Sequence, residues 1–193
     1  MIMKNLTQYI TEKLILNSNS KIRKKPEYKY HPKTREELKQ LIERRILDAA
    51  GNNILNQNHY KINLNDIDVS EITNMAGLFM NSSFDGDISE WDVSNVTDMA
   101  VMFNFSKFNG DISKWDVSKV KDMGYMFSNS KFTGENGDIS KWDVSNVEHM
   151  EGMFAKTEFN GDISKWDVSN VKNMKDIFKR CPIIKKFRPK FNK

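Results

Sequence analysis

A tandem repeat of about 24 residues constrains the fold of this chain more than any other feature. Tryptophan recurs at Trp91, Trp115, Trp142 and Trp166, with separations of 24, 27 and 24 residues. A degenerate copy precedes these four, with Ile67 at the tryptophan position. Units that repeat at such a period stack on one another and bury one continuous core. The sequence therefore predicts a repeat protein with five units.

The apolar spacing within one unit indicates its local structure. Ile88, Trp91 and Val93 have the spacing of a leucine-rich repeat, in which apolar side chains point inward from a short strand. From Val96 to Phe103 the apolar residues recur every three to four positions, which predicts a short helix or 3₁₀ turn. We therefore expect an α/β repeat fold, a leucine-rich-repeat-like right-handed solenoid with short parallel strands. The inward phase of the tryptophans favours a core role over a stacking platform for nucleic acid or sugar.

The charge of the chain changes sign twice along the sequence. Residues 1–62 hold 13 basic against 6 acidic residues (net +7), and residues 63–178 hold 10 against 20 (net −10). Residues 179–193 hold 7 basic residues and no acidic one. We predict a basic, mainly helical N-terminal cap at 1–62, the solenoid at 63–183 and a basic tail at 184–193.

Both ends of the repeat region have candidate covering segments. An amphipathic pattern predicts a helix near residues 4–16. Residues 34–37 fit a capping box that opens a second helix, which Gly51 is expected to end. A stack of repeats needs its first unit covered, so we expect this second helix to form an α-helical cap. At the other end, Ile183 takes the last repeated phenylalanine position, which predicts a capping tail; contact of its basic residues with nucleic acid or an anionic membrane is the alternative.

Charged side chains on the outward side of the expected strands are the candidate binding residues. We call the following nine residues the charged face: Asp68, Glu90, Asp92, Lys114, Asp116, Lys141, Asp143, Lys165 and Asp167. One interpretation is a solvated ladder of opposite charges, which contributes little stability per pair. The other is a recognition surface on the concave face of the solenoid, the face through which solenoids commonly bind.

No metal, cofactor or catalytic site is predicted. A second acidic column follows the glycines, at Asp87, Asp111, Asp138 and Asp162. Stacked carboxylates can bind calcium, but the glycine-rich nonapeptide pattern of calcium β-helices is missing, and Asp after a turn often accepts backbone N–H groups instead. The three histidines lie in different contexts, and the sequence has no glycine-rich phosphate loop. We therefore expect a protein that is not an enzyme.

The repeat also carries a family resemblance. The motif F-N-G-D-I-S-K-W-D-V-S-N-V, followed by M-x-x-M-F, recurs in nearly every unit. Over residues 64–183 it resembles the BspA-like leucine-rich-repeat surface protein family. The resemblance implies a right-handed solenoid with parallel strands, and a role in adhesion and protein binding rather than catalysis.

These observations predict a non-enzymatic protein-interaction or scaffolding module whose partner is a protein, bound through the concave face. Two alternatives remain open. The acidic repeats could mimic nucleic-acid charge and occupy a basic site on a host protein, or the chain could be a structural component of a larger assembly such as a phage particle. Nucleic acid is expected only at the basic termini, and the oligomeric state is open.

No apolar run is long enough to span a membrane, no secretory signal is evident, and the single Cys181 fits a reducing compartment. We predict a cytoplasmic location, with virion or surface association as the alternative.

Overall fold

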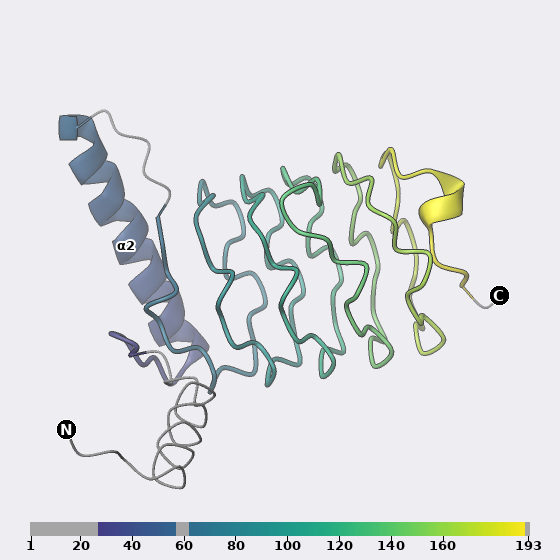
Figure 1. Cartoon of the computed structure of the whole chain (residues 1–193), viewed down its shortest axis with the longest axis horizontal. Coiled ribbons are helices and arrows are strands. Elements are labelled where there is room, and N and C mark those ends of the chain that lie inside the picture. The colour runs from purple at the N-terminus through teal and green to yellow at the C-terminus, as the bar shows by residue number, and fades with distance from the viewer. Residues whose placement is uncertain (1–26, 57–61, 192–193) are drawn as a thin grey trace, which may run out of the picture.

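The computed structural model describes residues 27–56 and 62–191, so the helix predicted near residues 4–16 lies outside the described residues. The described part contains the α-helix α2 (Arg35–Asn56) and the short 3₁₀ helix η1 (Lys185–Phe187). Between them the chain makes successive coils that lie side by side, with α2 beside the first coil and η1 beyond the last (Figure 1). Each coil is one repeat unit, which we call a rung.

The predicted leucine-rich-repeat-like solenoid with short parallel strands is wrong. The rungs in the described residues contain no strand, and neighbouring rungs share only isolated parallel bridges. The segment expected to be a strand is bent twice. The Trp91 N–H donates to the Ile88 carbonyl at 3.2 Å, and a second turn follows, in which the Val96 N–H donates to the Val93 carbonyl at 2.9 Å. Because these turns leave too few extended residues for a strand, the α/β solenoid classification fails as well.

Alternating backbone hydrogen bonds replace the helix or 3₁₀ turn predicted between Val96 and Phe103. Within a rung, the Met102 N–H closes a turn on the Met99 carbonyl at 3.2 Å. Four alternate N–H groups donate instead to the next rung, those of Met99, Val101, Phe103 and Phe105. Two of these residues have positive φ, at 52° for Val101 and 53° for Phe105. We call the side formed by residues 98–106, and by their counterparts in the other rungs, the ladder face.

Side chains in the core also connect the rungs. The tryptophan Nε1–H groups donate to carbonyls of the preceding rung at 2.9–3.2 Å, namely those of Leu64, Ile88, Ile112 and Ile139. One column of phenylalanine rings stacks from rung to rung with centroids 5.4–6.1 Å apart: Phe79, Phe103, Phe127, Phe154 and Phe178. The tryptophans are only 4–6% exposed, so their predicted inward orientation is confirmed. A buried tryptophan needs a partner for its N–H, and the stack supplies one on every rung.

Helix α2 begins at the predicted place but ends later. The Glu37 N–H donates to Thr34 Oγ1 at 3.1 Å, and the Glu37 carboxylate accepts the Lys33 N–H at 2.7 Å. These bonds satisfy N–H groups at the helix start. The helix continues through Gly51, which does not adopt the left-handed φ that commonly ends a helix. On the side facing the first rung, Leu38 and Ile42 are buried in the same core cluster as the repeats.

The tail covers part of the last rung. Ile183 is buried, and Phe187 and Phe191 pack against the core while remaining partly exposed. The Phe187 carbonyl accepts the Ile163 N–H at 3.0 Å, which attaches the tail to the last rung. The apolar core of the last rung therefore does not end at bulk solvent.

Candidate binding surface

The structure places the charged face on successive rungs. Eight of its nine residues are exposed, and Asp68 is partly buried. They do not converge on one point, since each rung contributes its members at a similar place around the coil. The charged face is therefore an extended surface and not a pocket.

Each aspartate of the charged face is held by its own rung. Its carboxylate accepts the N–H of the serine two residues later at 3.0–3.1 Å, in Asp68, Asp92, Asp116, Asp143 and Asp167. The hydroxyl and the N–H of Ser118 lower the pKa of Asp116, and Ser169 lowers the pKa of Asp167 in the same way. Such local turns orient the carboxylates. The charged face thus carries fixed negative charges at regular intervals.

The basic members of the charged face lie beside these aspartates. The Lys114 ammonium group pairs with the Glu90 carboxylate of the preceding rung at 2.7 Å. Both side chains are more than half exposed, so this pair contributes little stability. Lys141 and Lys165 are also exposed. The Glu90–Lys114 pair matches the predicted ladder of opposite charges, and the recognition surface stays a prediction.

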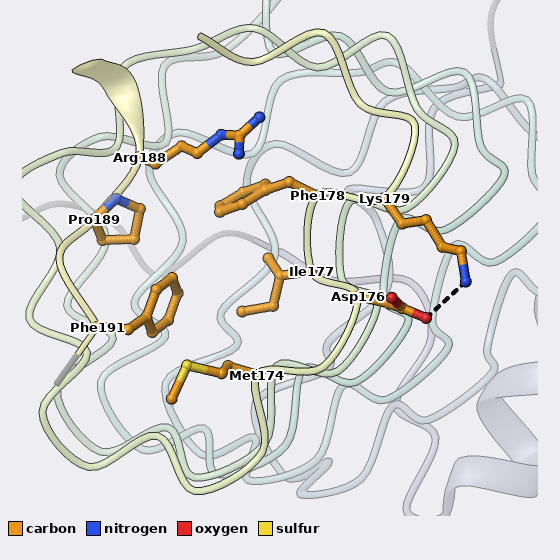
Figure 2. A pocket seen from close by; sticks show the side chains of 8 residues that line it. All are labelled: Met174, Asp176, Ile177, Phe178, Lys179, Arg188, Pro189 and Phe191. Carbon is orange, nitrogen blue, oxygen red and sulfur yellow. Dashed lines mark hydrogen bonds and ion pairs between the residues drawn. The ribbon is translucent and has the colours of Figure 1, made fainter. Parts of the chain in front are cut away.

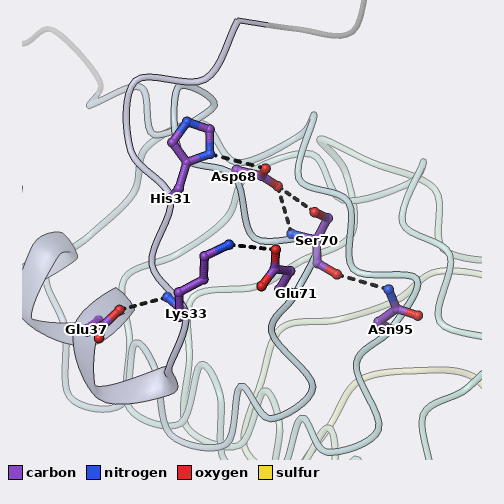
Figure 3. A network of polar contacts seen from close by, with 7 residues as sticks. All are labelled: His31, Lys33, Glu37, Asp68, Ser70, Glu71 and Asn95. Atoms are coloured by element: carbon purple, nitrogen blue, oxygen red, sulfur yellow. Dashed lines mark hydrogen bonds and ion pairs between the residues drawn. The ribbon is translucent and has the colours of Figure 1, made fainter.

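Asp68 belongs to a network that attaches the N-terminal segment to the first rung (Figure 3). Its carboxylate accepts the Ser70 hydroxyl at 2.6 Å and lies 3.4 Å from His31 Nδ1. Lys33 pairs with Glu71 at 2.6 Å in the same network. Partial burial raises the pKa of Asp68, but the hydrogen bonds from Ser70 and His31 outweigh it and lower the pKa overall. We therefore assign Asp68 a structural role.

The second acidic column consists of turn caps. Its carboxylates accept serine N–H groups at 2.8–3.0 Å, in Asp87, Asp111, Asp138 and Asp162. The N–H and the hydroxyl of Ser140 lower the pKa of Asp138. Within residues 27–56 and 62–191, no group of three or more metal-ligating side chains comes together.

A groove on the ladder face was missed by the sequence reasoning. Its volume is about 630 Å³, and its lining includes Val101, Phe105 and Tyr125. Phe105 is 57% exposed and Tyr125 is 39% exposed, although both are aromatic. The left-handed backbone of Val101 costs about 1–3 kcal/mol, because a β-branched residue rarely adopts it. The same backbone conformation recurs at this position in the other rungs, for example at Tyr125 and Asp176, so it belongs to the repeat.

The groove continues into a basic region. Lys156, Lys179 and Arg180 line its far part. At its aromatic end, the Tyr125 hydroxyl donates to the Glu151 carboxylate at 2.7 Å, which lowers the pKa of Glu151 and raises that of Tyr125. The groove therefore combines exposed aromatic surface with cations.

One signal in the sequence could have located this groove. The core residues repeat faithfully, whereas two positions of the ladder face change from rung to rung. The first position reads Gly77, Val101, Tyr125, Gly152 and Asp176. The second position reads Asn81, Phe105, Asn129, Lys156 and Arg180. All ten residues have positive φ, so the backbone is constant while the side chains differ.

Comparisons with known proteins give one match. Residues 51–135 and 129–192 match the model of a family described as "Mycoplasma protein of unknown function, DUF285". No curated protein matches, and no solved structure matches. Among the described residues, no helix has the length and apolar character that crossing a bilayer requires.

Proposed function

The chain belongs to the DUF285 family of Mycoplasma proteins of unknown function, and from this premise we propose that it is a non-enzymatic protein-binding module. One observation carries the proposal: a closely packed, repeated core supports a ladder-face groove whose side chains vary. Variable side chains on a constant backbone suit recognition, because the framework is already ordered before a partner binds. The resemblance to BspA-like proteins, with their role in adhesion and protein binding, points the same way.

Three residues of the groove are of types common at protein-binding surfaces. Aromatic residues and arginine are enriched where proteins bind one another, whereas Lys156 and Lys179 are of a type that is depleted there. Phe105 and Tyr125 provide apolar area with few rotatable bonds, and Arg180 provides a planar cation at the same groove. We assign the main contact to this groove and keep the charged face as a second candidate surface.

The experiment compares two variants with matched folding. In Phe105→Asn/Tyr125→Gly, each residue is replaced by one found at the same position of other rungs, and both replacements tolerate positive φ. This variant is expected to fold with an unchanged or higher melting temperature. Partners are captured from a lysate with the tagged full chain, identified by mass spectrometry, and their affinity is then measured with purified protein. We expect the groove variant to weaken binding at least tenfold.

The control variant tests the charged face. Asp92→Asn, Asp116→Asn and Asp143→Asn together remove three charges, while the asparagine side chains can still accept the serine N–H groups. Loss of binding in this variant alone would move the site to the charged face. Undiminished binding in both folded variants would refute the proposal for both surfaces.

The charge-mimic alternative makes a different prediction. A partner held by imitation of nucleic-acid charge should dissociate steeply as salt is added, and nucleic acid should compete with the chain for it. A partner anchored in the groove by Phe105 and Tyr125 should depend on salt only weakly. Measuring the affinity at low and high salt separates the two functions.

A further inference from the structure

We propose that the C-terminal end of the stack binds an acidic polypeptide segment, which would add its backbone carbonyls to the last rung. This site adjoins the groove of the proposed function, because Asp176, Lys179 and Arg180 contribute to both, but it does not depend on that function. The site consists of four backbone N–H groups of the last rung, the hollow beside them, and the surrounding basic residues.

The first step is the direction of the inter-rung hydrogen bonds on the ladder face. The Met75 N–H donates to the Asp98 carbonyl at 2.8 Å, and the adjoining Met99 N–H donates to the Asp122 carbonyl at 2.9 Å. The carbonyl of residue 98 and the N–H of residue 99 belong to the same peptide group. Peptide groups at this position therefore align head to tail from rung to rung, and three neighbouring positions on the ladder face do the same.

Aligned peptide groups leave opposite partial charges at the two ends of the stack. The same arrangement in an α-helix places positive charge at the free N–H groups and negative charge at the free carbonyls. At the first rung, the groups that end the peptide rows are carbonyls. One of them, the Ala76 carbonyl, accepts hydrogen bonds from both Nε and Nη2 of the Arg35 guanidinium group. A cation on the helix side thus covers the negative end of one of these rows.

At the last rung the corresponding N–H groups lack such a cover. By the pattern of the preceding rungs, they belong to Met174, Asp176, Phe178 and Arg180. Within the part of the chain that the structure describes, none of these four donates to a backbone carbonyl or a side chain. Met174 is 36% exposed, although its counterparts in the preceding rungs are buried. An edge of unpaired N–H groups is a template for pairing with another chain.

The tail closes the apolar core without covering this edge. The Arg188 guanidinium group lies 5.1 Å from the centre of the Phe178 ring, where the next phenylalanine of the column would stack. Arg188, Pro189 and Phe191 line one side of a hollow of about 420 Å³ (Figure 2). Its other side is formed by five residues of the last rung: Met174, Asp176, Ile177, Phe178 and Lys179. The hollow gives apolar side chains of a bound segment a place to pack beside the N–H groups.

The charge of this end selects an acidic occupant. Residues 174–191 contain seven basic residues and one acidic residue. That acidic residue, Asp176, is paired with Lys179 at 2.9 Å. The basic side chains and the positive ends of the peptide rows both favour negative charge. A second copy of this chain fits poorly, since its own last rung offers donors, and α2 lies beside its first rung (Figure 1).

The probe is a fluorescein-labelled synthetic peptide with the sequence of residues 85–106. It contains the four carbonyls that accept the N–H groups of the first rung, and it has five acidic residues and no Lys or Arg. A scrambled peptide of the same composition is the control. Binding to the full chain is followed by fluorescence anisotropy, and amide hydrogen exchange is measured by NMR with and without the probe.

We expect the probe to bind at least tenfold more tightly than the scrambled peptide. The amides of Met174, Asp176, Phe178 and Arg180 should exchange fast in the free protein and at least tenfold more slowly with the probe. The charge variant Lys175→Glu/Lys185→Glu should weaken binding at least tenfold, and its matched control Lys107→Glu/Lys131→Glu, with the same change in net charge, should weaken it less than threefold. The variant Met174→Pro, which removes one donor, should weaken binding compared with Met174→Leu.

Four results would overturn the proposal. The first two concern the probe: that it does not bind, or that it binds but protects other amides. The third is slow exchange of the four amides in the dilute free protein, which would mean that this chain covers its own edge. The fourth is protection of these amides that increases with protein concentration in the absence of the probe, which would make a second copy the occupant. The groove variant Phe105→Asn/Tyr125→Gly should bind the probe normally, so this proposal and the proposed function can fail separately.

Discussion

Replacing Trp115 with alanine is expected to destabilise the stack by about 3–5 kcal/mol, as truncation of a large core residue does. The side chain is 4% exposed, and its ring lies 6.4 Å from that of Phe103 in the preceding rung. The neighbouring rungs are tied together by backbone hydrogen bonds, so they cannot collapse far into the space left by the indole. We therefore expect a value in the upper part of this range.

The hydrogen bond of the indole contributes a smaller share. The Ile88 carbonyl accepts Trp115 Nε1–H at 3.2 Å, but it also accepts the Trp91 N–H at 3.2 Å. Removing the indole therefore leaves the carbonyl with one partner, and the loss is about 0.5–1.5 kcal/mol. The variant Trp115→Phe keeps most of the apolar volume and should cost only about 1–2 kcal/mol.

Thermal unfolding followed by far-UV circular dichroism measures both variants. A chain of this length changes its melting temperature by about 2–4 °C per kcal/mol, so Trp115→Ala should melt about 6–20 °C below the unmodified protein. Urea unfolding gives the free energy independently. If Trp115→Ala melted within about 1 °C of the unmodified protein, the packing described for the tryptophan column would be wrong.

Three further predictions concern other parts of the rung. The bonds from Ser140 lower the folded-state pKa of Asp138, so the stability they provide is present above the unfolded pKa of about 3.9 and is lost as the pH falls below it. The melting temperature should therefore drop between about pH 5 and pH 2. Ser140→Ala removes the hydroxyl bond and keeps the backbone N–H bond, so it should reduce that drop only in part; an unaltered acid profile would contradict the role of the hydroxyl bond. Gly86→Ala should destabilise by about 1–3 kcal/mol, because the added methyl group would overlap the Ile62 carbonyl oxygen, whereas Gly51→Ala, with open space around it, should stabilise α2 by about 0.5–1 kcal/mol; urea unfolding measures both, and equal effects would argue against the close packing at Gly86. Millimolar calcium should leave the melting temperature unchanged, since the second acidic column already accepts serine N–H groups; a shift reversed by a chelator would refute this.

The period of the repeat and the burial of its apolar columns could be predicted from sequence. A residue that recurs at the same place in every unit occupies the same environment in every rung, and a large apolar residue in that position is most stable inside. Trp91 and Trp115 follow this logic and are buried. The start of α2 was also predictable, because the Thr34–Glu37 contact is local in sequence.

The local backbone could not be predicted in the same way. The Ile88–Val93 segment has apolar residues at the spacing of a strand, but that spacing records only which side chains face inward. Two turns, each closed by a hydrogen bond from an N–H group to the carbonyl three residues earlier, place the same side chains inward without forming a strand. On the ladder face, Val101 and Phe105 adopt positive φ, which their residue types disfavour, so their own rung carries no sign of this backbone. The sign lies in other rungs, where Gly77, Asn81 and Gly152 occupy the same positions.

The head-to-tail rows of peptide groups on the ladder face also bear on how the stability of this chain depends on its number of repeats. Hydrogen bonds in a row polarise one another, and condensed-phase estimates of the strengthening are about 10–30% per bond. An inter-rung bond in the middle of the stack, such as that from the Tyr125 N–H to the Glu151 carbonyl, has bonded neighbours on both sides, whereas the last bond of that row, from the Gly152 N–H to the Lys175 carbonyl, has one. Adding a repeat would therefore strengthen bonds that already exist, and shortening the array would weaken those that remain. We expect stability to rise more steeply than in proportion to the number of rungs.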